Sequence, residues 1–174
     1  MSIDNNDNIS IIRISSVLKG FELADKLNKF FNFELKKTSD FTYEKNGTFI
    51  SFDCFSYHNP FHSITILLIN NNGNDEFTTL VASSIKKINY LFVVIGRDHE
   101  HISHSFIKGL TKVEINRKKT KINEKLLTYI TNIPQINALQ TDFIYPSKNK
   151  TTYISEKLKM FLLNYPVNVL NIYK

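Results

Sequence analysis

Apolar residues recur every three or four positions in an early segment of the chain. Phe21, Ala24, Leu27 and Phe31 follow this spacing, so in a helix they would lie along one face. Charged side chains occupy most of the positions between them, which is typical of a helix with one buried and one solvated side. The pattern therefore predicts an amphipathic helix over residues 21–31.

Runs rich in β-branched and aromatic residues predict strands on both sides of this helix. The Asn46-Gly47 pair predicts a tight turn between two of them, because these residues adopt positive φ at low cost. The continuous apolar run over 90–95 predicts a central strand that is covered on both faces. The other expected strands span residues 9–15, 33–37, 41–44, 48–57, 63–69 and 136–145.

Further helices are expected in the second half of the chain. Asp98 would cap a helix over about 99–110, and similar patterns predict helices over 123–129 and 155–163. Strands and helices do not alternate regularly in this order, which argues against a parallel βαβ arrangement. The expected fold class is therefore α+β, with a mainly antiparallel sheet and helices packed on one of its faces.

Length and composition place the chain in the range of one domain. Its 174 residues, of which 42% are hydrophobic, are enough for a self-sufficient core. We therefore expect a single α+β domain over residues 1–174, with a frayed polar start at 1–7 and an apolar C-terminal tail at 167–174. That tail would pack either on its own core or on a partner.

The sequence shows no feature of secretion or membrane insertion. Its polar N-terminal residues lack the basic and then apolar segments of a signal peptide. No window approaches the roughly 18 apolar residues that a transmembrane helix requires. The single cysteine, Cys54, excludes an intramolecular disulfide. These observations predict a cytoplasmic protein without a membrane partner.

The net charge of +6 has two interpretations. A positive domain attracts polyanions, which include nucleic acids, acidic proteins and anionic membranes. A codon bias towards lysine would give the same charge with no partner at all.

The strongest local charge lies in a basic run over residues 108–125. Such a run can neutralise phosphates and bind RNA without sequence specificity. It contains no aromatic residue on which a base could stack, and the alternative is a solvated loop between helices. The candidate nucleic-acid-binding residues are Lys112, Arg117, Lys118, Lys119, Lys121 and Lys125.

One cluster of metal-ligand residue types follows the central apolar run. On a helix, His101 and His104 would share a face, with Asp98 about one turn earlier. Imidazole and carboxylate groups are common ligands of zinc, so Asp98, His101 and His104 form a candidate metal site. The alternative is a solvated first helical turn that Asp98 caps.

The chain contains no complete catalytic motif. The patterns Gly-x-x-x-x-Gly-Lys, Gly-x-Gly-x-x-Gly, Gly-x-Ser-x-Gly and His-Glu-x-x-His are all absent from the sequence. Cys54 lies in an alternating apolar pattern, so we expect a small buried residue and not a nucleophile. We therefore predict no catalytic residues and no cofactor. The favoured function is a non-enzymatic interaction or accessory protein with a protein partner, and the alternative is an RNA-associated protein that binds through the basic run.

Several short segments share a spaced pattern with one protein family. Asn89-Tyr90-Leu91-Phe92 stands where that family has an Asp-Tyr pair and an apolar run. Residues 18–23 are similar to its opening, residues 51–57 and 68–71 to its middle strands, and residues 133–142 to its closing segment. In these segments the chain resembles the IPExxxDY proteins of Bacteroidota. That family has no established activity, so the resemblance implies a cytoplasmic setting and no specific function.

Overall fold

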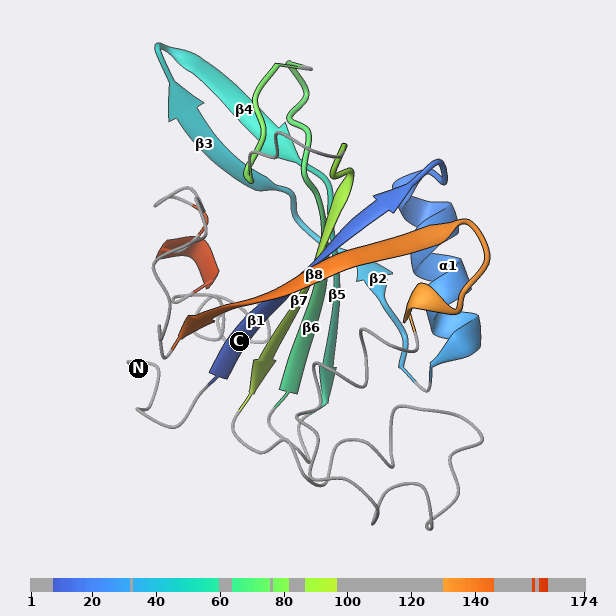
Figure 1. Ribbon diagram of the computed structural model, residues 1–174. Helices are drawn as coiled ribbons and strands as arrows, with labels where there is room; N and C mark the ends of the chain where they lie inside the picture. The colour runs from blue at the N-terminus through green and yellow to red at the C-terminus, as the bar shows by residue number, and fades with distance from the viewer. Residues whose placement is uncertain are drawn as a thin grey trace, which may run out of the picture.

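The computed structural model describes residues 8–31, 33–59, 64–75, 77–81, 87–96, 130–145, 158 and 160–162. These residues form eight strands and a helix of 11 residues, and residues 130–131, 158 and 160–162 are also helical. Six of the strands form one sheet, and the other two form a separate hairpin (Figure 1). The described part of the fold is therefore mainly β.

The six-stranded sheet is antiparallel throughout. Its strands are β1 (Asn8–Ser16), β2 (Lys36–Lys37), β5 (Cys54–Asn59), β6 (Ile64–Asn70), β7 (Tyr90–Gly96) and β8 (Ile136–Tyr145). The spatial order is β2-β5-β6-β7-β1-β8. The first strand of the chain therefore lies between β7 and β8, which are far from it in sequence.

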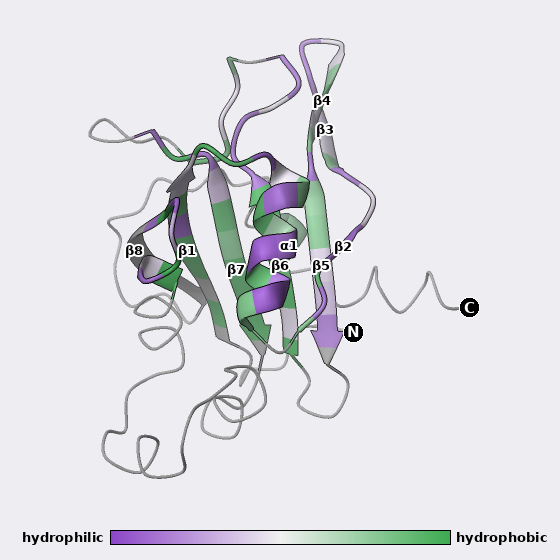
Figure 2. Ribbon diagram, turned by 90° about the vertical axis from the view of Figure 1, so that its right-hand side faces the viewer, coloured by the Kyte–Doolittle hydropathy of each residue, from purple (hydrophilic) through white to green (hydrophobic). Residues whose placement is uncertain are grey.

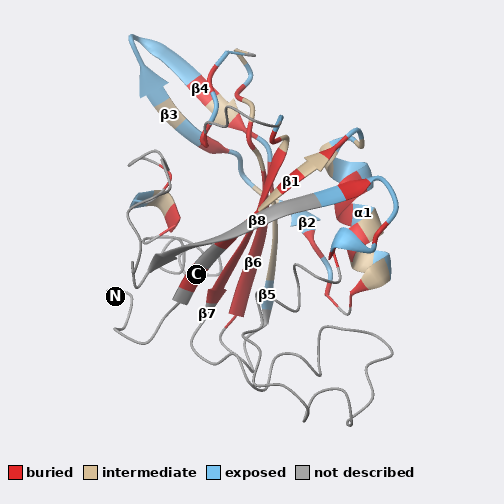
Figure 3. Cartoon of the chain, in the orientation of Figure 1, coloured by how far each residue is buried: buried red, intermediate tan, exposed pale blue. Residues whose placement is uncertain are grey.

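Both faces of the central strands are apolar. Because successive side chains of a strand point to opposite faces, Ile12 of β1 packs on one side of the sheet while Ile11 packs on the other. Residues 64–69 of β6 and 90–95 of β7 are all buried (Figure 3). The prediction of a central strand over 90–95 is confirmed, and the sheet requires cover on both faces.

The helix α1 (Gly20–Phe30) covers the first face of the sheet (Figure 2). Leu23, Ala24 and Leu27 are buried against apolar side chains of the sheet, and each buried leucine stabilises the fold by about 2 kcal/mol. Phe21 instead is 62% exposed, because it lies one residue out of phase with the buried stripe. The predicted helix is confirmed with a shift of one residue at each end.

No helix among the described residues is long and apolar enough to cross a membrane.

The second face is covered by a different set of elements. The hairpin of β3 (Phe41–Lys45) and β4 (Thr48–Phe52) packs its base on this face. Its turn contains Asn46 at φ 52° and Gly47 at φ 76°, which confirms the predicted turn. Residues of other segments complete the cover, and these are Leu80, Val81, Ile88, Leu158 and Leu162.

The expectation of an α+β fold with helices packed on one face is wrong. The described residues form a mainly β fold, in which one face of the sheet carries α1. The other face carries a β-hairpin, residues of the connection between β6 and β7, and the helical residues Leu158 and Leu162, which lie within the helix expected over 155–163. The physical reason is that the central strands are apolar on both sides. A helical layer on one face would leave the second apolar face in water.

The single strand expected over 48–57 is two strands in the structure. β4 pairs with β3, and β5 pairs with β6. Asp53 lies between them, and its carbonyl oxygen accepts the backbone N–H of Asn70 at 2.8 Å. One continuous alternation of buried and exposed residues therefore runs through a junction between two sheets.

Candidate functional site

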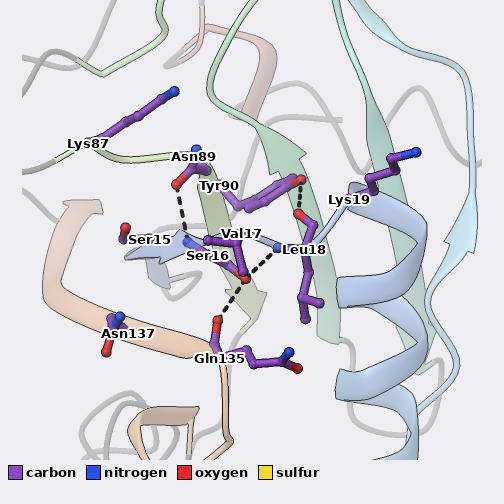
Figure 4. A pocket seen from close by; sticks show the side chains of 10 residues that line it. All are labelled: Ser15, Ser16, Val17, Leu18, Lys19, Lys87, Asn89, Tyr90, Gln135 and Asn137. Carbon is purple, nitrogen blue, oxygen red and sulfur yellow. Dashed lines mark hydrogen bonds between the residues drawn. The ribbon is translucent and has the colours of Figure 1, made fainter.

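A hollow of about 620 Å³ opens where the end of β1 meets the starts of α1, β7 and β8. Three segments that are far apart in sequence line it (Figure 4). We call this site the Ser16 corner. Its described lining residues are Ser15, Ser16, Val17, Leu18, Lys19, Lys87, Asn89, Tyr90, Gln135 and Asn137.

Ser16 fixes the bend that follows β1. Its hydroxyl donates to the carbonyl oxygen of Gln135 at 2.9 Å and accepts the backbone N–H of Leu18 at 3.2 Å. Its backbone N–H donates to Oδ1 of Asn89 at 3.1 Å. Ser16 is 9% exposed, so bulk water competes little for these bonds. One small residue therefore ties β1 to the starts of β7 and β8.

Tyr90 holds the other end of the bend. Its hydroxyl donates to the carbonyl oxygen of Leu18 at 2.7 Å. Burial raises the pKa of Tyr90, and the negative charges of Asp53 and Glu22 raise it further. The phenol therefore stays protonated and keeps its hydrogen bond to the bend.

Val17 lies between these two anchored residues and is 89% exposed. Its neighbours Ser16 and Leu18 are held through the hydrogen bonds described above, so the backbone presents Val17 in one position. Because the backbone is already held in place, covering this side chain with a partner costs little additional backbone conformational entropy. This is the property expected of an anchor in a binding site.

Gln135 contributes the most unusual backbone conformation at the site. Its φ is 70°, in the left-handed region that costs a residue with a long side chain about 1 kcal/mol. Its carbonyl accepts the Ser16 hydroxyl, and its side-chain oxygen accepts Nζ of Lys26 at 2.6 Å. The strained residue therefore joins α1 and β1 at the rim of the hollow.

The lining of the Ser16 corner suits binding more than it suits catalysis. Its described polar side chains are hydroxyls, amides and the ammonium groups of Lys19 and Lys87. Both lysines are exposed. These groups offer hydrogen-bond donors and positive charge, which would hold a polar or anionic ligand.

Other chemically notable residues lie outside this site. Cys54 is fully buried, and burial raises the pKa of its thiol to about 11, which confirms the prediction of a small buried residue.

Lys37 hydrogen-bonds with Asp40 and Asp53, and its Nζ lies 5.6 Å from the centre of the Phe55 ring. This exposed cluster holds one positive and two negative groups in contact with water, so it is a weak surface ion-pair network.

The residues that the sequence singled out as sites lie outside the described residues. These residues are the metal candidates Asp98, His101 and His104, and the basic candidates Lys112, Arg117, Lys118, Lys119, Lys121 and Lys125. Both sites therefore remain predictions. Among the residues that the structure describes, no three His, Cys, Asp or Glu side chains gather in a way that could hold a metal ion.

The sequence did not predict the Ser16 corner. Its residues come from positions 15–19, 87–90 and 135–137, and no periodic pattern links these segments. The one local signal was Val17, an apolar residue placed between two predicted elements. An apolar residue in a connection is common, so this signal alone does not identify a site.

Comparisons of the chain with protein-family models, curated proteins and solved structures each give no match. The resemblance to the IPExxxDY proteins therefore remains a prediction.

Proposed function

We propose that this chain is a cytoplasmic, non-enzymatic accessory protein that binds a protein partner at the Ser16 corner. The main support for this proposal is the setting of Val17. Its side chain is 89% exposed, while hydrogen bonds hold both of its neighbours, Ser16 and Leu18, in place. Residues that dominate a contact lie near its centre, within a ring of neighbouring contacts that exclude water. The hydroxyl, amide and ammonium groups of the lining are the groups that would form such a ring around Val17.

Other exposed apolar side chains do not share this arrangement. Phe49 is 71% exposed and Phe77 is 92% exposed, but neither lines the described hollow. Single exposed apolar residues are normal on protein surfaces. The combination of exposure, anchoring and a neighbouring hollow supports Val17 as the docking residue.

A pull-down from source cells with the tagged protein and two variants tests the proposal. Val17→Glu should lower the amount of captured protein about tenfold or more, because it replaces the apolar side chain at the centre of the contact with a charged one. Phe77→Glu is the matched control, since it makes the same type of change at another highly exposed residue. Both variants should keep the wild-type free energy of unfolding, because both positions are already in water. If Val17→Glu captures the same proteins in the same amounts, the proposed function is wrong.

The second candidate function is RNA binding through the basic run, which the clustering of positive charge over 108–125 favours. Affinity for single-stranded RNA should then fall steeply with salt. The double variant Lys118→Glu, Lys119→Glu should weaken binding without changing the unfolding transition. An affinity that does not depend on salt would exclude this function.

A further inference from the structure

We infer that the segment bound at the Ser16 corner is an acidic peptide, in which Asp or Glu residues flank an apolar side chain. This inference rests on the proposed function, and it names the chemistry of the partner at the same site. Three observations support it: the placement of Lys19 and Lys87, the hydrogen-bond donors of the lining, and the burial of Tyr90.

Lys19 and Lys87 lie on opposite sides of the hollow, with Val17 between them (Figure 4). Neither lysine forms an ion pair with another described residue. The carboxylate of Glu22 accepts the backbone N–H of Lys19 at 2.8 Å, so it is engaged at the start of α1. Two separated positive charges match two spaced carboxylates better than they match one small anion.

The amide groups of the lining add donors to these charges. Oδ1 of Asn89 accepts the backbone N–H of Ser16, which leaves the Nδ2 group of Asn89 to donate. Ser15 and Asn137 are opposite each other in the β1–β8 register and also line the hollow. Carboxylates are pure acceptors, so they would satisfy these donors.

The same site is a poor match to RNA. Proteins hold single-stranded nucleic acid by stacking its bases on exposed aromatic rings. The aromatic residue of the described lining is Tyr90, which is 6% exposed and donates its hydroxyl to Leu18. Val17 offers methyl groups instead, which pack against an apolar side chain of a peptide.

The test is selection from a displayed library of random seven-residue peptides, at low salt so that screening is weak. The wild-type protein should enrich peptides in which Asp or Glu surrounds an apolar residue. The double variant Lys19→Glu, Lys87→Glu should lower the affinity for the selected peptides by about tenfold or more. The control Lys36→Glu, Lys45→Glu has the same net charge and reverses two other exposed lysines, so it should retain binding.

Enrichment of neutral or basic peptides would overturn the inference, and so would equal binding by both double variants. A third arm measures binding of poly-uridylate. If poly-uridylate binds and requires Lys19 and Lys87 while the acidic peptides do not bind, the inference is wrong and the site binds nucleic acid. Suppose instead that the charge variants do not alter binding while Val17→Glu still abolishes capture. The proposed function would then stand, because capture would depend on position 17 and not on Lys19 and Lys87.

Discussion

Asn71 and Val81 are joined by two hydrogen bonds that run in opposite directions. The backbone N–H of Val81 donates to Oδ1 of Asn71 at 2.8 Å, and Nδ2 of Asn71 donates to the carbonyl oxygen of Val81 at 3.0 Å. The same Nδ2 also donates to the carbonyl oxygen of Ile88 at 3.1 Å. Asn71 is 2% exposed, so one buried side chain links both ends of the connection between β6 and β7.

Replacing Asn71 with Ala should lower the free energy of unfolding by about 3 kcal/mol, because it leaves several buried backbone groups without partners. Denaturant unfolding of the purified variant measures this change. Asn74→Ala is the matched control, since Asn74 is exposed and its Oδ1 accepts the backbone N–H of Ser51 at 3.1 Å. The control should cost less than about 1 kcal/mol. Equal losses in the two variants would contradict this account of Asn71.

Replacing Ser16 with Ala should release the bend that carries Val17. The variant loses a hydroxyl that contacts both Gln135 and Leu18, which should cost about 2 kcal/mol of stability. If the proposed function is correct, the captured partner should also bind more weakly, because the bend is no longer ordered in advance. Ser15→Ala should change stability by less than about 0.5 kcal/mol. A Ser16→Ala protein as stable as Ser15→Ala would show that these bonds do not hold the corner.

Gly73 and Gly47 should respond differently to replacement with Ala. A Cβ at Gly73 would lie 2.6 Å from Cγ2 of Ile50, so the loop must move away from the hairpin, at a cost of about 1–3 kcal/mol. A Cβ at Gly47 meets no atom within 4 Å, and its φ of 76° alone should cost about 1 kcal/mol. Thermal or denaturant unfolding compares the two variants. A larger loss at Gly47 would mean that loop packing is looser than the structure shows.

Cys54 should make stability depend on pH in the alkaline range. Burial raises the pKa of the folded-state thiol to about 11 from an ordinary value of 9.0, because the thiolate is poorly solvated in the core. The unfolded chain therefore releases this proton first, and the fold loses stability as pH rises above 9.0. Relative to Cys54→Ala, the wild type should lose about 2 kcal/mol by about pH 10.5 and nothing below about pH 8.

Denaturant unfolding of the wild type and Cys54→Ala across this pH range gives the difference directly. Lysines and tyrosines titrate in both proteins, so their contributions cancel in the comparison. A difference that stays constant with pH would show that the folded thiol ionises as easily as an unfolded one.

Local patterns in the sequence predicted several elements correctly. The apolar spacing of residues 21–31 indicated α1, because a helix places every third or fourth side chain on one face. Asn46-Gly47 indicated the turn between β3 and β4, because both residues adopt positive φ. The expected strand over 136–145 matches the bounds of β8. Each of these features depends on neighbouring residues alone.

The fold class and the strand break at Asp53 could not be predicted in the same way. Ile50, Phe52 and Cys54 alternate with more exposed residues as the pattern indicated, and all three are buried. The alternation continues unchanged across Asp53, although β4 and β5 pair with different strands. The alternation of side chains along a strand indicates which face of the strand is buried. It does not indicate which other strand pairs with it.

The sequence by itself therefore determined the local conformations and the apolar surfaces that must be buried. Only the tertiary structure decided that β1 lies between β7 and β8, with Ile12 opposite Phe92 on one side and Thr141 on the other. The same pairing brings Ser16 to Asn89 and Gln135 and so creates the Ser16 corner. Backbone preferences and side-chain period act over a few residues, whereas burial of two apolar faces is satisfied by contacts between segments that are distant in the chain.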